Sequence, residues 1–368
     1  MKYAQLIFIL VSCFLSANAQ PSFTGLEHLF KTPRHYVACY THESPVIDGD
    51  LSDTVWENAV WSDYFRDIEG DLKPDPPLRT RMKMLWDETC LYIAAELEEP
   101  HVWAYLQNHD DIVYYDNDFE IFIDPKNSTH HYFEIEVNAC NTIFDLFMPK
   151  AYRNGGGAMI SWNTPGLKSA VKVHGTLNDP ADKDQGWTLE MAIPFAAVTI
   201  GNTPDVPRDG RIWRINFSRV EWHTDIIDGK YVKRNDSSGK TLPEENWVWS
   251  PQGVINMHYP ERWGYLLFTK QTKPALAPAF IMPYEEKQRQ YLWLVYYRQK
   301  EYFTKNRRYA PTFDDLNIKH TVFEIDGKTN TLVMEATGRQ FSVVIESGDS
   351  RISINDEGLT GTNRRMNN

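Results

Sequence analysis

The sequence predicts an all-β protein: an antiparallel β-sandwich followed by a small α+β unit at the C-terminal end. Apolar and polar residues alternate with a period of two in many short runs between residues 36 and 268, which is typical of strands with one buried face. Loops rich in turn-forming residues separate these runs, and a long helical pattern appears only after residue 283. Many short strands with little helix indicate a sandwich.

Bulk composition limits the functions that fit this chain. Its 368 residues suffice for one large domain and one small one. The formal net charge of −12 argues against nucleic-acid binding, which needs a basic surface for the phosphates. Aromatic residues make up 13% of the chain, a high share that suits both a large core and ring-lined binding surfaces.

Residues 1–19 are predicted to be a secretory signal peptide. A short basic start, an apolar run and the small-residue site Ala17-Asn18-Ala19 follow one another in the expected order. The mature chain is therefore expected to be secreted or periplasmic, without a membrane span. Leu10-Val-Ser-Cys13 also resembles a lipoprotein cleavage box, so a lipid anchor at the cell surface is the alternative.

Taken in order, the strands follow a flexible lead-in and precede a change in composition. They are expected at residues 36–40, 79–86, 91–97, 118–124, 131–138, 141–148, 170–177, 187–193, 211–222, 247–251 and 261–268. A short helical piece is expected near residues 51–59, carrying Trp56 inward. We assign 34–268 to the sandwich, 269–283 to a linker, and 284–358 to a helix and short strands of unknown role.

The strands at 118–124 and 131–138 carry the most informative pattern. Their inward positions are aromatic or β-branched, whereas their outward positions hold carboxylates and an amide: Asp118, Glu120, Glu134, Glu136 and Asn138. A face made only for solubility would carry lysines and threonines instead. Acceptors and rings on one sheet face are typical of a sugar-binding surface, because hydroxyls donate to carboxylates and C–H faces stack on rings.

Two other classes of function remain open from the residues. A glycoside-cleaving enzyme needs two carboxylates about 5–9 Å apart, and Glu134 and Glu136, with Glu120 on a neighbouring strand, fit that spacing. A haem-binding sandwich would use His258 or Met257 as an axial ligand, although the C-x-x-C-H attachment motif is missing. The three cysteines after residue 19 are widely spaced and are expected to be core residues: Cys39, Cys90 and Cys140.

Three segments together resemble the family 9 carbohydrate-binding modules of glycan-degrading bacteria. They are Val46-Ile-Asp-Gly-Asp-Leu with Trp56, Leu85-Trp-Asp-Glu-Thr-Cys-Leu-Tyr-Ile, and Asn117-Asp-Phe-Glu-Ile-Phe-Ile-Asp124. The resemblance continues through Gly186-Trp-Thr-Leu-Glu-Met-Ala-Ile-Pro and covers about residues 35–268. It implies a β-sandwich that grips a sugar between two tryptophans, with charged and amide side chains bonding the hydroxyls.

The resemblance also implies site residues in this chain. The first stacking tryptophan falls at Tyr114, a bonding glutamate at Glu120 and an asparagine at Asn138. An arginine of the family falls at Glu136, and the second tryptophan falls near Met257, so both positions depart from the pattern. Trp249 lies a few residues before and is taken as its replacement. The family's structural calcium is left open here, with Asp48, Asp50 and Asp53 as weak candidates.

The sequence therefore predicts a secreted, non-catalytic carbohydrate-binding protein of a bacterial glycan-degrading system. The expected carbohydrate-binding residues are Tyr114, Glu120, Glu136, Asn138 and Trp249. The expected partner is a saccharide or polysaccharide, with a second protein of a glycan-utilisation system as a further partner. We expect neither a catalytic residue, nor a metal ligand set, nor a cofactor.

Overall fold

The computed structural model describes residues 20–201 and 203–362, which form two compact units. One unit consists of residues 26–283, with which the short segment 357–361 groups. The other consists of residues 284–356 together with the described residues 20–25. The expected signal peptide at 1–19 lies outside the described residues.

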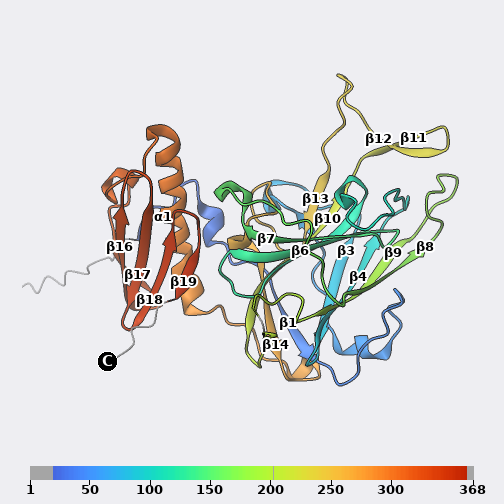
Figure 1. Ribbon diagram of the computed structural model, residues 1–368, viewed down its shortest axis with the longest axis horizontal. Coiled ribbons are helices and arrows are strands. Elements are labelled where there is room, and N and C mark those ends of the chain that lie inside the picture. Colours follow the sequence, from blue (N-terminus) through green and yellow to red (C-terminus); the bar gives the residue numbers. More distant parts are fainter. Residues whose placement is uncertain (1–19, 202, 363–368) are drawn as a thin grey trace, which may run out of the picture. The chain divides into compact units, whose positions relative to one another are not determined.

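Most of the first unit is a single curled sheet of twelve strands (Figure 1). The strands are β1 His35–Tyr40, β2 Arg66–Asp67, β3 Thr80–Trp86, β4 Cys90–Glu98, β5 Asp118–Asp124, β6 His130–Asn138, β7 Ile143–Lys150, β8 Lys168–His174, β9 Gly186–Pro194, β10 Ile212–Glu221, β13 Glu245–Val248 and β14 Gly264–Thr269. The main path runs β7-β6-β5-β10-β14-β1-β3-β4-β9-β8, and β13 pairs with β10 and β2. The all-β prediction is confirmed, and the strands expected at 79–86 and 91–97 pair as the antiparallel hairpin of β3 and β4.

Strand β1 joins the two halves of the sandwich, and it is the exception to the expected antiparallel order. It runs parallel to β14 on one side, with Tyr36 opposite Leu266, and parallel to β3 on the other, with Cys39 opposite Leu85. Parallel neighbours need long connections, and both connections here are long. Periodicity reveals a strand but not the direction of its neighbours, so the sequence could not show this arrangement.

The interior of the sandwich is filled by the inward residues of both halves. On β5 and β6 these are the predicted ones: Phe119, Ile121, Ile123, Phe133, Ile135 and Val137. Large rings complete the core, and Trp86, Trp187 and Trp213 are almost fully buried in it. The central strands are therefore anchored by one face, which leaves their other face to form a surface.

The predicted helical piece near residue 54 is a short 3-10 turn, Thr54–Asn58, tied to the sheet by one carboxylate. Glu190 on β9 accepts the backbone N–H groups of Asp48 and Gly49 at 3.0 and 2.9 Å, and the indole N–H of Trp56 at 2.6 Å. Gly49 has a φ of +84° and lies against the backbone of β8, where a Cβ would collide. This explains physically why the chain needs a glycine at position 49.

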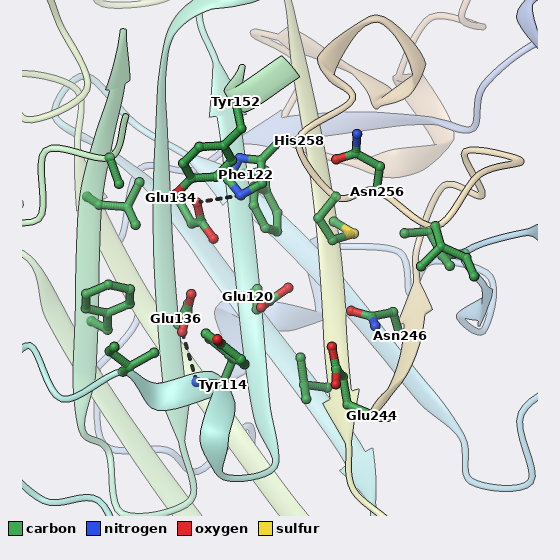
Figure 2. Close-up of a pocket in the computed structure, with 18 of the residues that line it drawn as sticks. Tyr114, Glu120, Phe122, Glu134, Glu136, Tyr152, Glu244, Asn246, Asn256 and His258 are labelled. Atoms are coloured by element: carbon green, nitrogen blue, oxygen red, sulfur yellow. Dashed lines mark hydrogen bonds and ion pairs between the residues drawn. The ribbon is translucent and has the colours of Figure 1, made fainter. Parts of the chain in front are cut away.

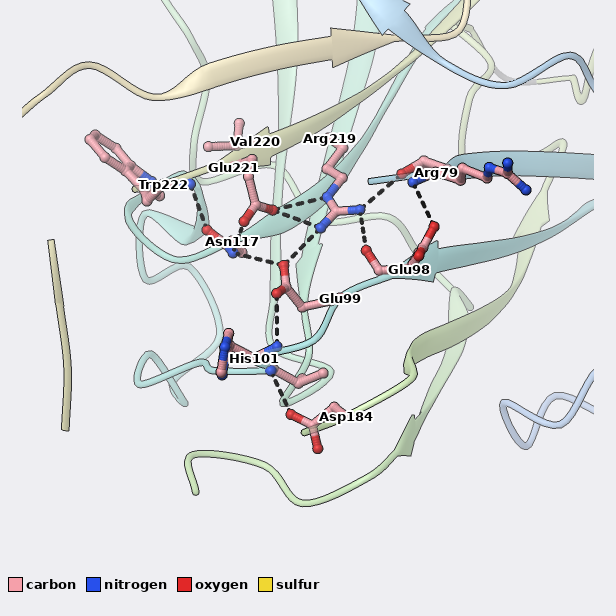
Figure 3. Close-up of polar contacts among 12 residues, drawn as sticks. Arg79, Glu98, Glu99, His101, Asn117, Asp184, Arg219, Val220, Glu221 and Trp222 are labelled. Atoms are coloured by element: carbon pink, nitrogen blue, oxygen red, sulfur yellow. Dashed lines mark hydrogen bonds and ion pairs between the residues drawn. The ribbon is translucent and has the colours of Figure 1, made fainter. Parts of the chain in front are cut away.

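A buried arginine closes one end of the sandwich (Figure 3). Arg219 on β10 pairs with Glu99 and with Glu221, both at 2.8 Å, and it also donates to the hydroxyl of Thr80. The amide of Asn117 donates to Glu221 at 2.9 Å. Buried carboxylates are costly unless they are paired, and at this position the fold supplies the opposite charge.

The remaining elements differ in part from the prediction. The polar loop after β10 contains an additional hairpin, β11 Thr224–Ile227 and β12 Lys230–Lys233, which projects from the unit in Figure 1. In the second unit, helix α1 spans Tyr284–Asn306 and packs on β17 and β18. The sheet strands of this unit are β15 Val322–Ile325, β16 Lys328–Ala336, β17 Phe341–Ser347 and β18 Ser350–Asn355, and they pair in chain order. The short strand β19, Thr360–Thr362, follows β18 in the strand order. Among the helices described, none combines the length and apolar character that crossing a bilayer requires.

Candidate functional site

The outward face of β5, β6, β7 and β10 forms a pocket of about 510 Å³ (Figure 2). We call it the carboxylate pocket. Its lining residues come from these strands, from β13 and from segments between strands: Ile68, Ile112, Tyr114, Glu120, Phe122, Glu134, Glu136, Phe144, Leu146, Tyr152, Ala158, Ile160, Val220, Glu244, Asn246, Ile255, Asn256, Met257 and His258. A pocket of this volume is within the range of small-molecule sites.

The strand register places the acidic side chains next to one another. Glu120 on β5 lies directly opposite Glu136 on β6, and Phe122 lies opposite Glu134. Side chains alternate along a strand, so these residues share the face that points away from the core. Like charges directly opposite each other destabilise a sheet. The sequence therefore maintains an arrangement that costs stability.

Glu120, Glu134 and Glu136 line the floor of the pocket, and the fully buried Asp118 lies next to them on β5. We call these four carboxyl groups the floor cluster. Each is at most 5% exposed. Burial, together with the neighbouring carboxylates, raises the pKa of Asp118, Glu134 and Glu136 well above the ordinary range. Burial raises the pKa of Glu120 to about 7. The floor cluster is thus poised to take up protons or another positive charge.

One end of the pocket is closed by a histidine in an aromatic setting. His258 bonds Tyr132 through its Nδ1 at 2.8 Å, and its Nε2 lies 3.8 Å from Glu134. The ring of Tyr152 meets it edge-on at 4.5 Å. Burial, and then the charge of Arg153, lowers the pKa of His258 to about 4. The imidazole is therefore neutral near pH 7 and does not neutralise Glu134.

Two tyrosines stand at opposite ends of the pocket, as Figure 2 shows. Tyr114 lies in the short 3-10 turn Val113–Tyr115 before β5, and its backbone N–H donates to Glu136 at 3.0 Å. Tyr152 lies just after β7 and is about half exposed. The turn that carries it needs a glycine, because a Cβ on Gly156 would overlap the carbonyl oxygen of Lys150. Because the two tyrosines lie at opposite ends, the glutamates of the floor lie between the two rings (Figure 2).

The predicted carbohydrate-binding residues separate into two groups. Tyr114, Glu120 and Glu136 are brought together in the pocket. Asn138 and Trp249 do not line it. The Asn138 amide is fully buried, donates to Leu106 and Asp116, and accepts from the backbone that follows it. The ring of Trp249 is 2% exposed and belongs to the sandwich core.

Basic side chains on the sandwich strands, the cysteines and the weak calcium candidates all lie in structural surroundings. Arg81 pairs with Glu96, Lys83 lies over Trp61, and Arg214 stacks on Tyr265, so each contacts a group outside the floor cluster. The three cysteines are free thiols. The weak calcium candidates are engaged locally: Asp48 and Asp53 accept backbone N–H groups, and Asp50 pairs with Lys172 at 2.6 Å.

Several pocket residues were not predicted as site residues. Tyr152, Glu244 and Asn246 come from segments that the sequence indicates only as loops or as a short strand. Three exposed isoleucines at the pocket, Ile112, Ile160 and Ile255, were likewise missed. For Tyr152 and Ile160, the sequence offered one signal of a binding role: an aromatic or apolar side chain in a loop close to the three glycines at 155–157. That signal does not say which sheet face the loop covers.

Comparison with protein-family models places this geometry in a known family. The model for carbohydrate family 9 binding domain-like proteins matches residues 47–266, which is more than half of the chain. The chain belongs to this family. The matched region contains nearly all of the sandwich and every residue that lines the carboxylate pocket.

Solved structures give related but distant matches. A candidate carbohydrate-binding protein from Bacteroides uniformis is 15% identical, with a TM-score of 0.47, over 64% of this chain and all of that one. A family 9 module from Caldicellulosiruptor kristjanssonii, solved with cellotriose, is 17% identical, with a TM-score of 0.39, over 67% of this chain and all of that one. The same module with glucose is 16% identical, with a TM-score of 0.38, over 68% of this chain and all of that one. Among curated proteins, none matches the chain.

Proposed function

We propose that this member of the carbohydrate family 9 binding domain-like family binds a saccharide in the carboxylate pocket. The observation that carries the proposal is the combination of aromatic rings at both ends with an acidic floor between them. Tyr114 and Tyr152 offer faces for the C–H surfaces of a sugar, and Glu120 and Glu136 accept from its hydroxyls. Amides at one wall, Asn246 and Asn256, add donors for ring and hydroxyl oxygens.

We further propose that the protein binds its saccharide without cleaving it. A glycosidase needs two carboxyl groups with pKa values pushed apart, so that one is protonated while the other is ionised. In the floor cluster burial raises the pKa of all four groups in the same direction. This uniform shift supports binding rather than acid–base catalysis. Uronic acids should be poor ligands, because Glu136 stands where the resemblance implies an arginine, so a uronate would meet a carboxyl group in place of a guanidinium.

We place the mature protein outside the cytoplasm, in a bacterial glycan-degrading system, because of the predicted signal peptide at residues 1–19. Intact mass of the secreted protein tests this. Cleavage after Ala19 supports the proposal, whereas a lipidated Cys13 at the new N-terminus would replace it with a lipid anchor. We also propose that one further protein of that system is a partner, and co-purification from glycan-grown cells would test it.

A glycan array followed by calorimetry tests the binding function. The mature protein is probed with neutral and uronic-acid glycans, and the same samples are analysed for released sugars. The variants Tyr114→Ala and Tyr152→Ala should each lose about tenfold in affinity, because a stacking ring is removed while the fold is retained. Tyr64→Ala is the matched control for Tyr152→Ala, since Tyr64 is 42% exposed, Tyr152 is 49% exposed, and Tyr64 lies outside the pocket. Binding that survives both pocket variants would refute the assignment of the site.

A further inference from the structure

The floor cluster contains a group of oxygens arranged closely enough to hold one ion. One carboxylate oxygen from each of Asp118, Glu120 and Glu136 lies within 4.8 Å of the others, and all three side chains are buried. They come from two adjacent strands whose register is fixed by the sandwich core beneath them. The geometry therefore does not depend on a flexible loop.

Within the part of the chain that the structure describes, three oxygens of the floor cluster accept no hydrogen bond. Asp118 Oδ2, Glu120 Oε2 and Glu134 Oε2 are fully buried and accept no hydrogen bond from the described residues. Two arginines of this region serve other groups: Arg153 pairs with Glu261 at 2.7 Å, and Arg219 lies on the opposite face of β10. An unsatisfied buried carboxylate oxygen costs several kcal/mol or more, so a fold that retains three of them needs a reason.

Several other buried carboxylates in this unit are satisfied, although Asp145 Oδ1 also accepts no hydrogen bond from the described residues. Glu99 is paired with Arg219, and Glu190 accepts three N–H groups. Asp116 accepts the backbone N–H groups of Tyr105 and Leu106, and the amide of Asn138. Where a buried carboxylate has a structural role, this unit thus supplies hydrogen-bond donors or an arginine to pair with it. The floor cluster differs because its missing partner is not supplied by the described chain.

We propose that Asp118, Glu120 and Glu136 bind a hard divalent cation of the calcium type at the floor of the carboxylate pocket. Calcium takes oxygen ligands at about 2.3–2.6 Å, so two oxygens bound to one ion lie at most about 5.2 Å apart. The three oxygens lie within 4.8 Å of one another and meet this requirement. Carboxylate oxygens without a thiol or a free imidazole favour calcium, magnesium or manganese over zinc or copper. Glu134 completes the negative charge around the ion.

The pocket leaves room for the other ligands of such an ion. Calcium takes six to eight oxygens, and three carboxylates leave positions for water or for hydroxyl groups. The volume of about 510 Å³ above the floor provides that space. The cation site stands independently of the proposed saccharide. If both are present, vicinal hydroxyls of the sugar would reach the ion directly.

Calcium titration of the full mature chain, dialysed against EDTA, tests the site by calorimetry and by thermal melting. We expect one site per chain and a higher Tm with calcium, since a ligand that binds only the folded state stabilises it. Glu120→Gln and Glu136→Gln should each weaken binding at least about tenfold, because each removes a charged ligand. Glu136→Gln should also raise the Tm in EDTA, because it removes the repulsion between Glu136 and the neighbouring carboxyl groups. A variant that is merely misfolded would have a lower Tm.

The matched control is Asp110→Asn, which removes one charge from a second acidic group made of His109, Asp110 and Asp145. Its calcium binding should equal that of the wild type. The inference is overturned if Asp110→Asn abolishes binding, if Glu136→Gln lowers the Tm in EDTA, or if the wild type binds none of calcium, magnesium and manganese up to about 10 mM.

Saccharide binding measured in EDTA and in calcium separates this inference from the proposed function. If a glycan binds equally well in EDTA and in calcium, and the chain binds no cation, the saccharide function stands and the cation site is refuted. Cation binding without any glycan ligand would do the reverse.

Discussion

Glu120→Gln tests the protonation behaviour of the pocket floor. Glu120 is 5% exposed, and burial raises its pKa from 4.5 to about 7 in the folded protein. As the pH rises, the unfolded chain therefore loses this proton first, and the folded state becomes relatively less stable between pH 4.5 and about 7. The shift corresponds to about 3 kcal/mol of stability, fully present below pH 4.5 and lost above pH 7. Glutamine stays neutral and carries no such loss.

The assay is urea unfolding of the wild type and of Glu120→Gln at several pH values from 4.5 to 8, in EDTA. The difference between the two proteins cancels the other titrating groups to first order. We expect the variant to gain up to about 3 kcal/mol on the wild type over this range. Glu57→Gln is the control, because Glu57 is exposed and its variant should follow the wild type. Parallel curves for wild type and Glu120→Gln would refute the reasoning.

Two further predictions concern groups that support the pocket. Arg219→Met should lower the free energy of unfolding by about 3–5 kcal/mol, because Glu99 and Glu221 lose their buried partner. Arg234→Met, at an exposed pair with Asp225, should cost less than about 1 kcal/mol. Equal losses of the two variants in urea unfolding would contradict the argument. Tyr132→Phe should cost about 1–3 kcal/mol, because it removes the bond to His258 Nδ1 and leaves that nitrogen buried without a partner; an unchanged unfolding midpoint would show that this bond contributes nothing.

The period-two pattern of the sequence was enough to predict the strands and their two faces. On β5 and β6 every inward residue was predicted correctly, because burying one face of a strand requires apolar residues at every second position. The same alternation placed Glu120 and Glu136 on the outward face. The family resemblance also came from local motifs, and the match over residues 47–266 confirmed it.

The tertiary structure decided what a local pattern cannot contain. Trp249 packs in the core because Gly264 on β14 has no side chain and so leaves space for its ring. The amide of Asn138 donates its hydrogen bonds to Leu106 and Asp116, in the segment that leads into β5, and is therefore not available to a ligand. Tyr152 reaches the pocket only because its loop returns across the sheet face. Above all, pairing of β5 with β6 and β10 sets four carboxyl groups together on one face and Arg219 on the other. Charge clustering of this kind depends on strand register between segments distant in the chain, which only the folded sheet fixes.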